Sequence, residues 1–400
     1  MKSVAVIGGG LIGLATAYKL LEKHPGIKLD VYEKEDRPGR HQSGRNSGVL
    51  HCGLYYQPGS LKAKLAVEGI REMTAFCQTH GIEHEICGKV VVASNQQQNE
   101  TLRGLAKRGE ANGLTGLKFL SSTELKEREP MVHATATLLV PEEGIVDYKA
   151  VMNKLVALIE EHGGAVHFNS AIWQVSESKQ NEVLVTTASG TKSYNWLVSC
   201  TGLHSDRTFS KYTSKKGPIR IIPFRGEYLS FKPEFEHMVN HLFYPVPDIK
   251  YPFLGVHFTR MISGEREVGP NAVLAFKREG YSNKDFNFKD TVESLTYVGF
   301  LNFLRKNFRF AMGEFASSLL TSSFIAKAKI MIPEVEANML VKGTAGVRAQ
   351  AMSAEGTLLM DFNIEREGNQ IHVLNAPSPG ATSSLAIASY ILDNYLTDLN

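Results

Sequence analysis

The first 35 residues alternate apolar runs with an amphipathic segment. The run SVAVIG has the composition of a buried parallel strand, and LIGLATAYKLLEKH follows it with Leu11, Leu14, Tyr18 and Leu21 at helical spacing. The run KLDVYE has the pattern of a second strand. This order predicts a βαβ unit at the start of the sequence.

In the remaining chain, segments in which strands alternate with helices are separated from segments rich in aromatic strands. A strand–helix–strand–helix pattern begins at about Gly88, an amphipathic helix is expected in VDYKAVMNKLVALIEEHGG, and aromatic-rich strands occupy much of 218–329. The last 65 residues add two strands and a closing helix. We therefore expect two lobes built from non-contiguous segments. The segments are 1–87, 140–215 and 335–400 for the first lobe, and 88–139 and 216–334 for the second.

Composition and charge narrow the class of protein. A chain of 400 residues with 43% hydrophobic and 21% charged residues is typical of a globular protein, and the net charge of +3 gives no reason to expect a nucleic-acid partner. The four cysteines form no CxxC pair and no ligand-like group with histidine, so we expect free thiols, a reducing compartment and no metal site. We expect no export signal and no spanning helix, which favours a cytoplasmic protein.

The glycine turn GGGLIG lies between the first strand and the first helix. In such a turn Gly8 permits the sharp bend, Gly10 lets the backbone approach a pyrophosphate, and Gly13 lets the helix pack closely on the sheet. Glu33 ends the second strand, where a carboxylate binds ribose hydroxyls and repels a 2′-phosphate. These residues predict a bound dinucleotide other than NADP, and they do not separate NAD from FAD.

Seven further motifs carry a resemblance that runs through the whole chain. They are RHQSGRNSGVLHCGLYYQPGSLKAKL, GIVDY, FRGEYL, YPFLGVHFTR, GPNAVLAFKREGY, GVRAQ and LNAPSPGATSSLAI. With these motifs the chain resembles the FAD-dependent amino-acid oxidase superfamily, and most of all the L-2-hydroxyglutarate dehydrogenase or oxidase family. The resemblance implies an α+β fold, in which the first lobe is a Rossmann-like FAD-binding domain and the second is a substrate domain with a mixed or antiparallel sheet. It also implies FAD-dependent oxidation of L-2-hydroxyglutarate to 2-oxoglutarate.

The resemblance assigns FAD contacts to several short segments. Gly8, Gly10 and Gly13 would bind the pyrophosphate, and Glu33 the AMP ribose. The remaining contacts fall in the loop after the second strand, at the adenine position, at a strand end and at the last helix. These residues are Ser43, Arg45, Asn46, Ser47, Ile172, Thr201, Gly202, Gly380, Ala381 and Thr382.

Oxidation of a 2-hydroxy acid needs a base for the hydroxyl proton, and histidine has a suitable pKa for this role. His51 lies in the loop expected at the cofactor and His257 in a strand of the substrate domain; both are candidates, and the loop position favours His51. Either histidine could instead hydrogen-bond the cofactor or a backbone carbonyl.

A dicarboxylate substrate also needs cationic partners, for which bidentate arginine is well suited. Lys277 and Arg278 should face opposite sides of a strand, so at most one reaches the site, while Arg260 should face away from His257 and Thr259 unless a bulge intervenes. Each cation could instead form a surface charge or a structural ion pair, least so Arg348. The candidate substrate-binding residues are Arg225, Tyr228, Thr259, Arg260, Lys277 and Arg348.

Residues 300–330 combine six phenylalanines with five basic residues and one glutamate, a net charge of +4. This composition suits a helix on an anionic membrane, from which reduced flavin could pass electrons to quinone, with oxygen as the other acceptor. The alternative is packing against the substrate domain or a neighbouring subunit. A peripheral position on the cytoplasmic face of the inner membrane would follow from the first reading, and the oligomeric state stays open.

Two other functions remain open at this stage. The same fold could oxidise an amino acid, an imino acid or glycerol 3-phosphate, of which glycerol 3-phosphate is also dianionic. A noncatalytic or RNA-associated flavin-binding protein is the third reading, although outside 300–330 the sequence has no concentrated basic tract.

Overall fold

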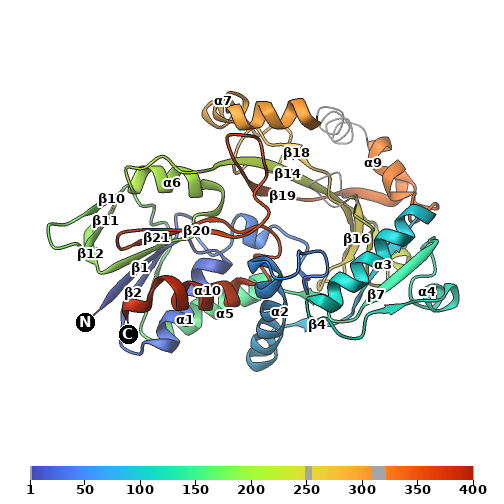
Figure 1. Cartoon of the computed structure of the whole chain (residues 1–400), viewed down its shortest axis with the longest axis horizontal. Coiled ribbons are helices and arrows are strands. Elements are labelled where there is room, and N and C mark those ends of the chain that lie inside the picture. The colour runs from blue at the N-terminus through green and yellow to red at the C-terminus, as the bar shows by residue number, and fades with distance from the viewer. Residues whose placement is uncertain (1, 248–254, 308–320, 400) are drawn as a thin grey trace.

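The first of two large sheets has six strands drawn from both ends and the middle of the chain (Figure 1). We describe it from a computed structural model that covers residues 2–247, 255–307 and 321–399. Its strands are parallel except for the β20–β21 pair, as expected for a Rossmann-like domain. In spatial order they are β20 (Asn363–Glu367), β21 (Gln370–Asn375), β13 (Trp196–Ser199), β1 (Ser3–Ile7), β2 (Lys28–Tyr32) and β9 (Ala165–His167).

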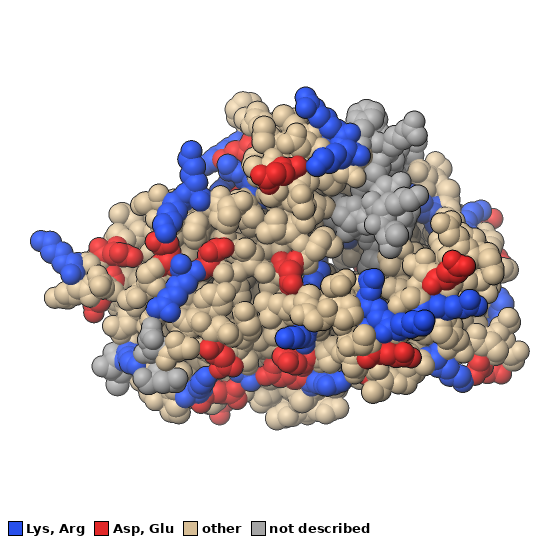
Figure 2. All heavy atoms as spheres, viewed as in Figure 1, with Lys and Arg blue, Asp and Glu red and all other residues tan. Residues whose placement is uncertain are grey.

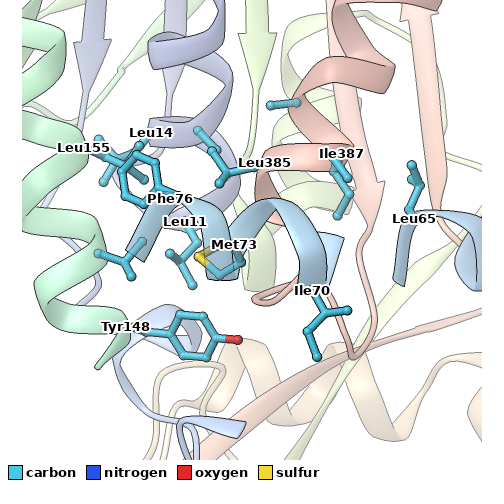
Figure 3. Packing of buried hydrophobic residues seen from close by; sticks show 14 of the residues in the cluster. Leu11, Leu14, Leu65, Ile70, Met73, Phe76, Tyr148, Leu155, Leu385 and Ile387 are labelled. Atoms are coloured by element: carbon cyan, nitrogen blue, oxygen red, sulfur yellow. The ribbon is translucent and has the colours of Figure 1, made fainter. Parts of the chain in front are cut away.

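Both faces of this sheet are covered, so all five residues of β1 are buried, four of them apolar. Val4 and Val6 face a core formed with α1 (Leu11–Lys23), α5 (Tyr148–Glu161) and α10 (Ser384–Tyr395), against which α2 (Leu61–His80) also packs (Figure 3). Ala5 and Ile7 face a second core under a small antiparallel sheet. That sheet contains β10 (Gln174–Glu177), β11 (Val183–Thr187) and β12 (Gly190–Tyr194).

The second large sheet is mixed and has nine strands within the described residues. β5 pairs in parallel with β15, while the other pairs are antiparallel. In spatial order the strands are β18 (Val273–Leu274), β14 (Arg220–Phe231), β17 (Arg266–Gly269), β16 (His257–Arg260), β15 (Leu242–Pro245), β5 (Lys89–Ala93), β7 (Ala136–Val140) and β6 (Lys118–Phe119), with β19 (Leu340–Met352) on the other side of β14. The predicted α+β class is confirmed.

The division of the chain into two domains stays a prediction. The structure shows that β19, which lies inside the segment 335–400 assigned to the first domain, pairs along its length with β14 of the nine-stranded sheet. A hydrogen-bonded ladder of this length fixes the strand to the sheet of the substrate domain. We therefore propose that the last boundary lies after β19 and not before it.

The two faces of the nine-stranded sheet differ in polarity. One face carries Val90, Phe243, Phe258 and Val268, which pack with α9 (Thr321–Ala328) in a second apolar core. Because side chains alternate along a strand, the opposite face carries the neighbouring residues. These include Lys89, Tyr244, His257, Thr259 and Glu267, all of which are buried. The polar face is turned toward the first domain, as its contacts with the loop at His51 show.

A second small sheet is built from three short strands of the first domain. Its strands are β3 (Val49–Leu50), β8 (Gly144–Val146) and β4 (His84–Glu85), in the order β3-β8-β4. The other described helices are α3 (Gln96–Ala111), α4 (Ser122–Arg128), α6 (Ser205–Tyr212) and α7 (Phe288–Leu295), with short 3-10 turns at Gln42–Gly44, Gly202–His204, Pro233–Met238, Ala337–Met339 and Thr397–Leu399. None of the described helices is long and apolar enough to cross a membrane.

Candidate active site

Four parallel strands of the first sheet end at the same edge, and the predicted cofactor segments follow them. Gly8 comes directly after β1, Glu33 after β2, Thr201 shortly after β13 and Gly380 after β21. In open α/β sheets this edge is where nucleotides bind. The fold therefore brings together segments that lie nearly 400 residues apart in the sequence.

The glycine turn is a backbone cradle that no larger residue could form. Gly8 has a φ of +109°, and a Cβ there would lie 2.4 Å from the carbonyl oxygen of Cys200. A Cβ on Gly13 would lie 2.0 Å from the carbonyl oxygen of Gly8, and one on Gly10 would lie 2.9 Å from the Ser43 hydroxyl. The amides at the start of α1 are thus left close to the edge of the sheet, as a pyrophosphate requires.

Glu33 and the loop after β2 are organised around this turn. The Glu33 carboxylate accepts hydrogen bonds from the amide of Gly9 (2.6 Å) and from that of Glu35 (2.9 Å). Ser43 Oγ accepts from the amide of Leu11 at 3.0 Å. The side-chain Nδ2 of Asn46 donates to the backbone carbonyls of residues 42 and 43, and its Oδ1 accepts from the backbone amide of residue 48. Asn46 thus shapes the loop.

The other predicted cofactor residues connect this edge to its surroundings. The Arg45 guanidinium lies 3.7 Å from the centre of the Tyr281 ring, and Ser47 lies near Tyr228, so the loop contacts the substrate domain. Thr201 Oγ1 bonds the hydroxyl of residue 208 at 2.7 Å, and a Cβ on Gly202 would meet Gln42 Oε1 at 2.8 Å. Ile172 packs against the core beneath β10–β12.

The start of α10 supplies the last part of the predicted FAD site. Gly380 is buried, Ala381 is half-buried, and Thr382 hydrogen-bonds Tyr148 at 2.8 Å. The buried hydroxyls of Ser383 and Ser384 have no hydrogen-bond partner within the described residues. Unpaired buried hydroxyls at a helix N-terminus, together with the glycine cradle, fit an extended dinucleotide with polar groups at both ends.

His51 and Glu143 face each other across the small sheet. Leu50 of β3 pairs with Gly144 of β8, so the next residue of β3 stands opposite the residue before β8. His51 Nδ1 lies 3.3 Å from Glu143 Oε2, and the His51 amide donates to Thr382 Oγ1 at 3.2 Å. The side chain of His51 is 19% exposed, whereas that of Glu143 is 1% exposed. The base candidate is thus held on two sides.

A buried lysine completes this cluster. Lys89 Nζ lies 2.7 Å from Glu143 Oε2, and it also lies over the rings of Tyr55 (4.6 Å) and Tyr244 (4.8 Å). Burial would raise the pKa of Glu143, but the Lys89 charge and the hydrogen bond from His51 outweigh it and lower that pKa to about 2. Glu143 is therefore ionised at neutral pH.

Sequence reasoning missed both Glu143 and Lys89. The run KVVVA has the pattern of a strand buried on both sides, and the structure buries all five of its residues. A lysine in such a run must have an anionic partner, which is the signal that could have identified it. The partner itself lies in PEEGIVDY, where nothing local separates Glu143 from Glu142.

His257 lies next to this cluster, but it has no carboxylate partner like that of His51 among the described residues. Its ring stacks on that of Tyr244 with centroids 3.9 Å apart, and its Nδ1 donates to the carbonyl of Gly255 at 2.9 Å. Burial lowers the pKa of His257 to about 3. His257 is therefore neutral at pH 7, and its protonated form is disfavoured.

Arg348 and Tyr228 lie near these histidines. The Arg348 charge contributes to the lowered pKa of His257 and acts against the rise in the pKa of Tyr228 that burial causes. Its Nη1 donates to the carbonyl of Asn271 at 3.2 Å. Gly226 leaves room for it, because a Cβ there would lie 2.9 Å from Arg348 Nη1. Thr259 lies on the same polar face and contacts the hydroxyl of Tyr244. The structure thus brings Arg348, Tyr228 and Thr259 together with His257.

The other predicted cations are used elsewhere. The Arg225 guanidinium binds Glu227, the carbonyl of residue 282 and the side chain of residue 283. Arg260 forms an ion pair of 2.5 Å with Glu85 of β4. Lys277 is exposed, while Arg278 is buried in a bidentate pair with Asp206. Residues 277 and 278 lie in a turn after β18, so the expectation that they belong to a strand was wrong.

One group of side chains has the composition of a metal site. Glu35, His41 and Glu279 place ligand atoms within 4.8 Å of one another. The ammonium of Lys34 lies 2.8 Å from Glu279 Oε1 and also pairs with Glu35, so a cation of the chain itself already neutralises these carboxylates. We interpret the group as an ion network between the domains.

Comparisons with known proteins agree with this geometry. The family model for FAD-dependent oxidoreductases (DAO) matches residues 3–393. The chain is 45% identical to an L-2-hydroxyglutarate dehydrogenase from Indibacter alkaliphilus, with 98% of each chain covered. It is 42% identical to the enzyme of that name from Escherichia coli K12, covering 99% of this chain and 94% of the other. The identity to the mitochondrial L-2-hydroxyglutarate dehydrogenase from Homo sapiens is 38%, covering 98% of this chain and 88% of the other.

Among solved structures, the FAD-bound L-α-glycerophosphate oxidase from Mycoplasma pneumoniae matches with a TM-score of 0.77. It is 23% identical and covers 99% of this chain and 96% of its own. At this identity the likeness shows a common fold and does not indicate the substrate.

Proposed function

Because the chain belongs to the FAD-dependent oxidoreductases, and within them to the L-2-hydroxyglutarate dehydrogenases, we propose that it oxidises L-2-hydroxyglutarate to 2-oxoglutarate. When bound, FAD supplies the two-electron acceptor for this reaction. The observation that carries the proposal is the 45% identity, over nearly the full length, to an L-2-hydroxyglutarate dehydrogenase. The polar face of the nine-stranded sheet supplies the groups that the reaction needs.

The proposed base is His51. Its Nδ1 is directed at an ionised carboxylate, which leaves Nε2 to accept the proton of the substrate hydroxyl. His257 is less suited, since its pKa of about 3 makes it a weak proton acceptor and its Nδ1 is bound to a backbone carbonyl. We assign His257 a positioning role next to Tyr244, as a neutral hydrogen-bonding group.

The proposed partner of a substrate carboxylate is Arg348. It lies with Tyr228 on the polar face, and a guanidinium there can bind a carboxylate through two parallel hydrogen bonds. The Tyr228 hydroxyl and Thr259 supply further polar contacts. The Arg348 guanidinium also donates to the carbonyl of Asn271 at 3.2 Å. We propose that from this position on the polar face it contributes to the selectivity for an acid.

Anaerobic stopped-flow measurement of the flavin absorbance tests this function. L-2-hydroxyglutarate should bleach the flavin band, and the D enantiomer should do so at least about 100-fold more slowly, since misorientation of the reacting carbon removes most of the benefit of positioning. His51→Asn should slow bleaching about 100-fold or more, as expected for loss of a general base. Faster bleaching by glycerol 3-phosphate than by L-2-hydroxyglutarate would contradict the substrate, and a normal rate in His51→Asn would contradict the base.

We further propose that the surface around α7 contacts an anionic membrane, where quinone would accept the electrons. Six apolar side chains are exposed along 286–301: Phe286, Phe288, Val292, Leu295, Val298 and Leu301. The exposed charged residues of the described stretch 284–307 are all basic: Lys284, Lys289, Arg305 and Lys306. Asp290 and Glu293 of α7 face inward, where both bind Arg207.

This surface differs from the one expected from 300–330. Phe300 and Phe303 pack inward against Phe224, and Phe324 lies in the core beneath the large sheet. Residues 308–320 of the expected segment lie outside the described residues. On the face shown in Figure 2, basic and acidic side chains are otherwise interspersed over the described residues. Exposed apolar groups next to unopposed basic groups are the combination that binds anionic lipid.

Vesicle flotation tests the membrane contact. The holoenzyme should float with vesicles of phosphatidylglycerol and phosphatidylcholine, and much less with phosphatidylcholine alone, because the basic groups need anionic lipid. The double variant Leu295→Glu/Val298→Glu should lose flotation. Val341→Glu, at an exposed apolar position of β19, is the matched control and should float normally. Undiminished flotation of the double variant would contradict this surface.

A further inference from the structure

The position of Glu143 opposite His51 is set by strand pairing. Leu50 pairs with Gly144 in an antiparallel ladder, so His51 and Glu143 are the next pair beyond it. Both carboxylate oxygens of Glu143 are used: Oε2 by His51 at 3.3 Å and Lys89 at 2.7 Å, and Oε1 by the Cys52 thiol at 3.3 Å. A buried carboxylate held in this way has little freedom to rotate away from the histidine.

We propose that Glu143 is the positioning residue of His51, and that Lys89 keeps Glu143 ionised so that it can serve in this role. The proposal rests on the function proposed above. Glu143 need not contact substrate, because its carboxylate accepts the Nδ1 proton of His51 and thereby holds the ring with Nε2 unprotonated. An imidazole without such a partner exchanges between its two tautomers, of which only one has the free Nε2 that the reaction needs.

Glu143 also stabilises the positive charge that His51 acquires during the reaction. The substrate hydroxyl proton moves to His51 Nε2, the hydride leaves carbon 2 with its electron pair for the flavin, and the C–O bond becomes C=O. His51 gains one positive charge in this step. Glu143 and Lys89 form a pair of net charge zero before it, and the carboxylate is the member of the pair that touches the ring. The nearby anion therefore favours the charge that develops on His51.

Other charged and titratable groups face this cluster from several elements. Lys89 comes from β5, Tyr244 from β15, His257 from β16 and Arg348 from β19. Lys89 and Arg348 are cationic and oppose a positive charge on the histidine, while Tyr244 and His257 are neutral at pH 7. Glu143 is the anion in direct contact with His51 among the described residues.

The test compares four single variants and one double variant of the holoenzyme. Glu143→Gln should lower the rate constant for flavin reduction by L-2-hydroxyglutarate about 10- to 100-fold with little change in KM, since it removes a partner of the base and no substrate contact. Glu143→Asp keeps the charge and should recover part of this loss. Glu142→Gln is the matched control, because the Glu142 carboxylate binds the amide and hydroxyl of Thr115 at the surface, and its rate should stay within about twofold of the wild type. Lys89→Met should slow reduction, and adding it to Glu143→Gln should cause little further loss.

A measurement that needs no turnover separates this inference from the proposed function. In ¹⁵N spectra of the imidazole nitrogens, His51 should show one neutral tautomer, with the proton on Nδ1, and a mixture of tautomers in Glu143→Gln; His51→Asn assigns its signals. An unchanged spectrum in Glu143→Gln would overturn the inference whatever the substrate. Equal rates in Glu143→Gln and Glu143→Asp, or full additivity of Glu143→Gln and Lys89→Met, would also overturn it. If wild-type flavin is not reduced by L-2-hydroxyglutarate but the tautomer changes as stated, the proposed function fails and the positioning role stands.

Discussion

Replacing Arg278 by methionine should destabilise the protein by about 3–5 kcal/mol, because Asp206 would keep a buried charge without its cationic partner. The two guanidinium nitrogens of Arg278 lie 2.5 and 2.9 Å from the two oxygens of Asp206, and the side chains are 2% and 3% exposed. Asp206 lies in α6, shortly after β13 of the first sheet, while Arg278 follows β18 of the second. The pair thus joins the two sheets, and its loss should destabilise the contact between them.

The assay is thermal unfolding of the holoenzyme followed by circular dichroism. The entropy of unfolding is about 2.1 cal/mol/K per residue, or about 0.8 kcal/mol/K for 400 residues, so a loss of 3–5 kcal/mol lowers Tm by about 4–6 °C. Lys277→Met changes the neighbouring exposed residue and should lower Tm by less than about 1 °C. Adding Asp206→Leu to Arg278→Met should restore part of the loss, because the unpaired charge is removed. Equal Tm values for the two single variants would refute the reasoning.

Three further outcomes follow from the site. Gly13→Ala should abolish retention of FAD through gel filtration, because the added Cβ would lie 2.0 Å from the carbonyl oxygen of Gly8; normal flavin content would contradict the cradle. Arg348→Lys should raise KM for L-2-hydroxyglutarate about 10-fold or more in steady-state assays, since it loses the bidentate fork, whereas an unchanged KM would remove Arg348 from the clamp. The folded pKa of His257 is about 3 and lies below the ordinary 6.5, so its contribution to stability is complete above pH 6.5 and is lost as pH falls toward 3. Urea unfolding should show a smaller loss of stability over this range in His257→Gln than in the wild type, and parallel curves would contradict the buried neutral histidine.

The sequence predicted the parts of the site that follow local rules. The βαβ order placed the glycine turn at a sheet edge, where Glu33 also lies. This inference needs only the periodicity of each element and the chemistry of a few neighbouring residues.

The remaining parts depend on pairings between distant segments. His51 and Glu143 meet because β3 and β8 pair in one particular register, and Lys89 reaches Glu143 from β5 of a different sheet; no local pattern reveals either meeting. Counting phenylalanines in 300–330 also does not show which way they face, and of those described Phe300 and Phe303 pack inward. Among the described residues, a run of exposed apolar side chains lies at 286–301, on and around α7.

The hydrogen bond from the His51 amide to Thr382 also sets the order in which the enzyme can become functional. The two residues are 331 positions apart, so at about 5–20 residues per second the ribosome needs roughly 17–66 s to make the second after the first. During that interval the loop with the proposed base exists without its anchor at the start of α10. A chain on the ribosome therefore cannot hold His51 in its final place, and oxidation waits for the last helix to be synthesised and docked.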